Sequence, residues 1–131
     1  MINIILAVFQ ILIALGIVGF WIGFFIGGKD KMDEIELVHE KTFPLPDLGW
    51  IVPLLIIAAI GLILEVGFGY LFSAVAGGGM MFLGLIDFAF HVQNDKYKTK
   101  DFDAYFSIFI DGVNIIFSII FIVYAYFNLQ I

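Results

Sequence analysis

Three long apolar stretches, separated by two short polar segments, limit what this chain can fold into. Residues 2–28 carry no charged side chain, and residues 48–92 and 104–129 carry only three carboxylates between them. A helix needs about 20 apolar residues, each rising about 1.5 Å, to cross the hydrocarbon of a bilayer. The first and last stretches are each long enough for one crossing, and the middle stretch for two. The sequence therefore predicts an all-α membrane protein, a four-transmembrane-helix bundle.

The composition agrees with a chain whose main solvent is lipid. Of its residues, 63% are hydrophobic and 14% are charged, whereas soluble domains are about 45–50% apolar and about 25% charged. No Ser- or Pro-rich linker divides the chain, so we expect a single transmembrane domain over residues 1–131. The first stretch exceeds the roughly 7–15 apolar residues of a signal peptide, and no basic residue precedes it, so we expect a retained helix.

The middle stretch must contain a reversal, and two glycine-rich segments are candidates. They are residues 67–69 and residues 77–79. The first is preferred because it leaves two helices of sufficient length, and it places the triple glycine inside a helix. The predicted helices are then residues 2–28, 48–66, 70–92 and 104–129, with cytoplasmic loops at residues 29–47 and 93–103.

The lysines predict the orientation of these helices. All six lie in the two polar segments, at positions 29, 31, 41, 96, 98 and 100, and there is no arginine. Counting crossings places both segments on the same side of the membrane, and loops rich in Lys and Arg face the cytoplasm. We therefore expect both termini on the extracytoplasmic side of a multi-pass protein of the plasma (inner) membrane.

Helical spacing places a polar stripe on each of the last two predicted helices. One stripe contains Gly77, Met80, Gly84, Asp87, His91 and Asn94, and the other contains Asp103, Ser107, Asp111, Asn114 and Ser118. Asp87 and Asp111 both fall roughly 10 Å inward from the lysine-bearing loop, at about 1.5 Å per residue. The stripes are therefore expected to meet. The candidate residues for an ion path, a proton path or a polar network are Asp87, His91, Asp111, Asn114 and Ser107.

The two intramembrane aspartates lack enough positive charge to balance them. A charge at the bilayer centre costs at least about 2.5–3.5 kcal/mol, so such acids face a partner, water or the bundle interior. His91 is the only titratable base in the predicted membrane segments, and one imidazole cannot neutralise both Asp87 and Asp111. The sequence leaves three alternatives: one acid stays protonated, a cation binds, or water enters.

Glycines on the first and third predicted helices indicate close helix contacts. Gly19, Gly23 and Gly27 form overlapping GxxxG pairs, and Gly77 and Gly84 lie on the polar stripe of the third helix. Contacts within one chain and contacts with another chain use the same kind of surface. The expected partners are the lipid bilayer and either a second copy or a larger membrane protein.

These patterns support three hypotheses of function. The leading one is cation- or proton-linked transport or permeation, and the second is a non-catalytic accessory or assembly protein whose polar residues only hold helices together. The third is an intramembrane lipid-modifying enzyme with Asp87 or Asp111 as acid or base beside His91. No catalytic motif supports an enzyme, so a non-enzymatic role is favoured.

Several other functions are disfavoured by composition. The net charge of -6 and the absence of arginine argue against a nucleic-acid partner. The absence of cysteine excludes thiol chemistry. His39, near Glu36 and Glu40, matches no known metal-ligand spacing, so the sequence predicts neither a metal site nor a cofactor.

Overall fold

The computed structural model describes residues 1–129, which are helical and contain no strand. The described elements are α1 (Ile2–Ile26), η1 (Gly28–Lys31), α2 (Glu34–Glu40), α3 (Pro44–Pro46), η2 (Asp47–Ile51), α4 (Val52–Ile63), α5 (Gly67–Gln93), η3 (Lys96–Thr99) and α6 (Phe102–Asn128). The chain divides into two compact units, one over Met1–Phe72 and one from Ser73 onward. Helix α5 passes from the first unit into the second.

Four helical segments in the described part of the chain are long and apolar enough to cross a membrane. They are Ile2–Ile26, Glu34–Ile63, Gly67–Gln93 and Phe102–Asn128. Many of their largest apolar side chains are exposed, including Phe82 at 67% and Phe127 at 77%. Such surfaces are unfavourable in water and favourable in lipid. The prediction of an all-α chain with four apolar helices of membrane-spanning length is confirmed.

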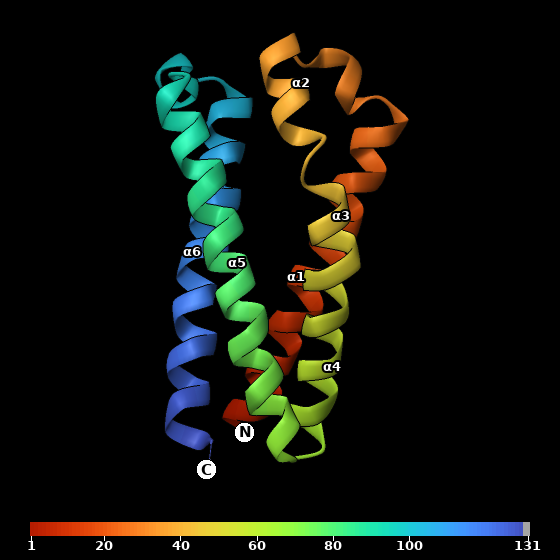
Figure 1. The fold of residues 1–131 in the computed structure, drawn as a ribbon, viewed down its shortest axis with the longest axis vertical. Coiled ribbons are helices and arrows are strands. Elements are labelled where there is room, and N and C mark those ends of the chain that lie inside the picture. The colour runs from red at the N-terminus through yellow and green to blue at the C-terminus, as the bar shows by residue number, and fades with distance from the viewer. Residues whose placement is uncertain (130–131) are drawn as a thin grey trace. The chain divides into compact units, whose positions relative to one another are not determined.

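The first unit is built on the packing of α1 against α4, which run side by side in Figure 1. Leu55 and Ala58 are completely buried there, because small and branched side chains let two helices pack closely. Two polar contacts supplement this core. The indole Nε1 of Trp21 donates a 2.9 Å hydrogen bond to Asp47, and the Asn3 amide donates a 3.0 Å hydrogen bond to Tyr70.

The chain reverses at residues 64–66, directly before the glycine segment where the sequence places the turn. Glu65 has a φ of 56°, and the Val66 N–H donates to the Gly61 carbonyl while the Glu65 N–H donates to Leu62. This is the hydrogen-bond pattern of a Schellman helix ending, with Glu65 in the position that usually holds glycine.

The glycines beside this turn allow the backbones of α4 and α5 to touch. A Cβ placed on Gly61 would lie 2.5 Å from the Cα of Gly69, a distance that real Cβ atoms do not show. Neither position therefore tolerates a side chain without movement of the backbone.

In the second unit, α5 and α6 lie side by side (Figure 1). A Cβ on Gly77 would lie 2.9 Å from Ile122 and 3.0 Å from the Ser118 carbonyl, and a Cβ on Gly84 would lie 3.0 Å from Asn114. These two glycines therefore let α5 approach α6. The triple glycine at residues 77–79 lies inside α5.

The helix bounds differ from the expected ones where local capping decides them. The helical segment before the turn begins at Pro44 and ends at Ile63, because Pro44 occupies a first-turn position that needs no N–H donor. Helix α6 begins at Phe102, because the Asp101 carboxylate accepts a 2.8 Å hydrogen bond from the Ala104 N–H.

A side chain added at the glycines of α1, or at Gly27 directly after it, would have open space around it among the described residues. A Cβ on Gly19, Gly23 or Gly27 would meet nothing within 4 Å. Among the described residues, no other helix therefore packs closely against these glycines. Their role in packing against another chain stays a prediction.

Candidate functional site

A buried polar cluster joins α5, α6 and the short helix between them. The imidazole Nδ1 of His91 lies 2.7 Å from Oδ2 of Asp111, and the imidazole Nε2 lies 3.8 Å from Oδ1 of Asp87. Tyr97 donates its hydroxyl proton to the same Oδ2 of Asp111. We call Asp87, His91, Tyr97 and Asp111 the His91 cluster.

The helical repeat explains why three of these residues meet. Asp87 and His91 are four residues apart on α5, so they share one face of that helix. Asp111 lies on α6, and Gly84 allows α6 to approach one turn away from Asp87 on α5. The predicted meeting of Asp87, His91 and Asp111 is what the structure shows, with ligand-type atoms of all three within 4.8 Å of one another.

Tyr97 is the member of the cluster that sequence reasoning missed. It lies on η3, in the lysine-bearing segment that was expected to be a loop. Its ring packs on His91 with ring centroids 5.7 Å apart, and on Phe88 with centroids 5.9 Å apart. The sequence feature that could have identified Tyr97 is its position as the one aromatic residue between α5 and α6.

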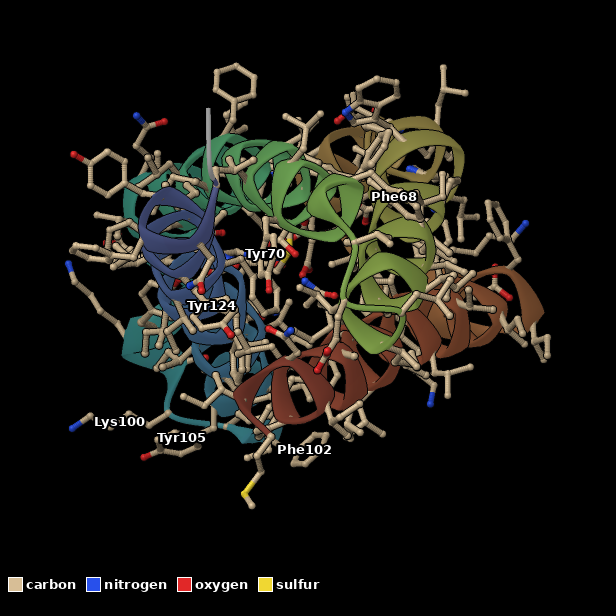
Figure 2. The ribbon with its side chains drawn as sticks, turned by 90° about the horizontal axis from the view of Figure 1, so that it is seen from below. Phe68, Tyr70, Lys100, Phe102, Tyr105 and Tyr124 are labelled. Atoms are coloured by element: carbon tan, nitrogen blue, oxygen red, sulfur yellow. The ribbon has the colours of Figure 1, made fainter. Side chains whose placement is uncertain are left out.

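Burial isolates the cluster from its surroundings. Asp111 is 1% exposed and His91 is 3% exposed, while Asp87 and Tyr97 are partly buried. Other aromatic side chains nearby point outward: Figure 2 shows Phe102 and Tyr105, at the start of α6, directed away from the helices of their unit. Burial makes the charges of His91 and Asp111 interact more strongly than they would in water.

One oxygen of Asp111 has no hydrogen-bond partner among the described residues. Oδ2 accepts from Tyr97 and lies at hydrogen-bond distance from His91, but the buried Oδ1 has none. A buried carboxylate oxygen without a donor costs free energy unless a proton, a cation or a water satisfies it.

The charges of the cluster change the pKa of Tyr97, the member that lies on η3. Burial, the hydrogen bond to Asp111 and the charges of Asp111 and Asp87 together raise the pKa of the Tyr97 phenol. The phenol therefore remains a neutral hydrogen-bond donor throughout the physiological pH range.

The other predicted site residues lie outside the cluster. Asn114 faces Gly84 across the helix pair, and its backbone carbonyl accepts a hydrogen bond from the Ser118 hydroxyl. Ser107 is partly buried on α6, four residues before Asp111. Their share in an ion or proton path remains a prediction.

The arrangement places two carboxylates and one imidazole where they can share a positive charge. If His91 is protonated and both aspartates are ionised, the three groups keep a net negative charge. Such a site favours uptake of a further proton or a cation.

Comparisons with protein-family models, curated proteins and solved structures found no match for this chain.

Proposed function

We propose that this chain is a small multi-pass membrane protein that holds and passes a cation or a proton at the His91 cluster. The observation that carries the proposal is the buried carboxylate of Asp111, whose Oδ1 has no hydrogen-bond partner among the described residues. Buried ionisable groups in membrane segments commonly mark ion and proton pathways.

The charge balance supports this proposal. His91 is the only base in the cluster, and every lysine lies within residues 29–47 or 93–103. Two carboxylates with one imidazole therefore attract positive charge from outside the cluster. A network that only held helices together would be more stable with neutral side chains, because an uncompensated buried charge destabilises the helix pair.

Flux through reconstituted vesicles tests the proposal. The purified chain is placed in liposomes containing a pH-sensitive dye or a dye sensitive to metal cations, and flux is compared with that of protein-free liposomes. We expect flux in the parent protein and flux near the protein-free level in Asp87→Asn and Asp111→Asn, which keep side-chain size and remove charge. Asp103→Asn, an exposed position at the start of α6, should retain the parent flux.

The main rival is an accessory or assembly protein in which the same residues only hold helices together. The hydrogen bonds that link Tyr97, Asp111 and His91 favour that role as well. The rival predicts no flux in the parent, unchanged thermal stability in both Asn variants, and recovery of a larger membrane protein in fixed ratio after mild solubilisation. That set of results would replace the transport proposal.

We also propose that the lysine-bearing segments face the cytoplasm and both termini face outside. The lysine bias supports this orientation. The chain has no native cysteine, so single cysteines can be introduced cleanly. In intact cells, a cysteine at Thr99 should resist an impermeant thiol reagent, while one at Gln130, outside the described residues, should react. Labelling of Thr99 alone would reverse the orientation.

A further inference from the structure

The His91 cluster has the composition of a transition-metal site. It supplies one imidazole and two carboxylates, one ligand atom from each residue lying within 4.8 Å of the others. Imidazole nitrogen is a preferred ligand of zinc, iron, nickel and copper, whereas calcium and magnesium prefer sites made only of oxygen.

The nitrogens of His91 have separate roles in this geometry. Nδ1 lies 2.7 Å from Oδ2 of Asp111, and in the tautomer with its proton on Nδ1 the imidazole donates to that carboxylate. In that tautomer Nε2 carries the lone pair, and it lies 3.8 Å from Oδ1 of Asp87. Both atoms can act as metal ligands, and a cation can bridge this separation.

The 3.8 Å separation suits a metal ion. Bonds from a metal to imidazole nitrogen and to carboxylate oxygen are each about 2.0–2.2 Å, so two such bonds span at most about 4.0–4.4 Å. An ion placed between Nε2 of His91 and Oδ1 of Asp87 fits that separation with a bent angle at the metal. A direct hydrogen bond between these two atoms would be shorter.

Asp111 provides a second, independent indication of a ligand. It is 1% exposed, and its Oδ1 is buried without a hydrogen-bond partner among the described residues. Its Oδ2 meanwhile holds the imidazole and the Tyr97 hydroxyl. A carboxylate that accepts the N–H of a metal-binding histidine fixes the ring and raises its basicity. Oδ1 remains available to the ion directly or through a bound water.

We infer that the His91 cluster binds one divalent first-row transition-metal ion, held by His91 Nε2 and Asp87, with Asp111 orienting the imidazole and Tyr97 fixing Asp111. This inference deepens the proposed function and rests on it, since the metal is then the cation handled at the cluster. The absence of cysteine leaves a nitrogen and oxygen ligand set, which suits zinc, iron and manganese.

Metal binding to the intact chain tests the site without relying on transport. The protein in nanodiscs is dialysed against Zn²⁺, Mn²⁺, Mg²⁺ or Ca²⁺, and bound metal is counted by elemental analysis. We expect about one Zn²⁺ or Mn²⁺ per chain and much weaker Mg²⁺ and Ca²⁺ binding. Asp87→Asn and His91→Gln should each weaken binding on the order of 10–100-fold or more.

Two matched variants separate this site from adventitious binding. Glu65→Gln removes an exposed acid at the turn before α5, and Asp103→Asn removes an exposed acid of α6. Both should bind metal like the parent. Helicity and melting temperature identify any variant that fails to fold, and Asp87→Asn keeps the test decisive if His91→Gln is unstable.

The outcomes distinguish this inference from the proposed function. No bound metal, equal binding in parent and Asp87→Asn, loss of binding in Glu65→Gln, or equal affinity for Mg²⁺ would each overturn the metal site. Proton flux without metal binding would overturn the metal site and leave the proposed function. Metal bound at the cluster in a chain without any flux would support the site and overturn transport.

Discussion

The two units of the chain stabilise their helices in different ways. In the first unit, α1 and α4 pack through apolar side chains such as Leu55 and Ala58, and the Trp21 indole donates a hydrogen bond to Asp47. In the second unit, four polar side chains gather at one place between α5, α6 and η3. This cluster combines two carboxylates, an imidazole and a phenol, and such a concentration of ionisable groups favours a functional role.

The largest effect should follow from placing a methyl group in the close backbone contact between α4 and α5. In Gly61→Ala, the new Cβ would lie 2.5 Å from the Gly69 backbone, which cannot rotate away as a side chain would. We expect a loss of about 1–3 kcal/mol or more of unfolding free energy, as in overpacked cores. Thermal unfolding in detergent, followed by circular dichroism, measures it.

Gly16→Ala is the matched control for this change, because a Cβ on Gly16 meets nothing within 4 Å among the described residues. Alanine is the better helix former, so this variant should unfold at the parent temperature or slightly above it. Equal melting temperatures for Gly61→Ala and Gly16→Ala would contradict the close contact between α4 and α5.

The helices of both units were predictable from sequence because lipid requires long apolar segments. The four stretches of membrane-spanning length follow directly from that requirement. The turn was harder to place, because Glu65 occupies a left-handed position where glycine is the usual signal. Gly67 and Gly69 therefore marked the neighbourhood of the turn, while the reversal itself lies at residues 64–66.

The next effect tests the polar contact of the first unit. Trp21 is 2% exposed, and its indole N–H is donated to Asp47. Trp21→Phe removes that donor and leaves space in the core, so we expect a loss of about 1–3 kcal/mol. Trp50→Phe is the control, since Trp50 is 56% exposed. Equal stability of the two variants would show that the single hydrogen-bonded pair does little for the first unit.

A smaller effect is expected from removing one hydrogen bond of the His91 cluster in the second unit. Tyr97→Phe keeps the ring that packs on His91 and removes the hydroxyl that donates to Asp111. Hydrogen bonds to charged groups contribute about 1.5–3 kcal/mol, and partial exposure of Tyr97 places the expected loss near the lower end. Melting curves measure the change. Tyr105→Phe, at an exposed position, should have no effect, and a matching effect would contradict a specific role for Tyr97.

The candidate site was predictable only in part. Helical spacing identified Asp87, His91 and Asp111, because residues three or four apart on a membrane helix share a face. The spacing within each helix carries no information about which atoms pair across the two helices. Tyr97 was missed for the same reason, since it reaches Asp111 from a segment whose short helix has no apolar periodicity. Asp101 was likewise passed over, although its position before α6 is typical of a helix cap.

The smallest effect concerns an aspartate cap, a feature that both units share: Asp101 caps the start of α6, and Asp33 caps the start of α2. The Asp101 carboxylate accepts hydrogen bonds from the Ala104 N–H and then from the Thr99 hydroxyl, and these lower the pKa of Asp101. Its ordinary pKa is about 3.9, so the stabilisation is fully present above about pH 4 and is lost as pH falls through the lower folded value. Asp101→Ala should therefore melt a little below the parent at pH 7, and this difference should shrink as the pH falls below about 4.

Asp101→Asn keeps an uncharged cap at every pH, so its melting temperature should stay above that of Asp101→Ala in acid as well. A constant difference between parent and Asp101→Ala down to pH 2 would show that the charge of Asp101 adds nothing to the cap, because the other acids titrate equally in both proteins.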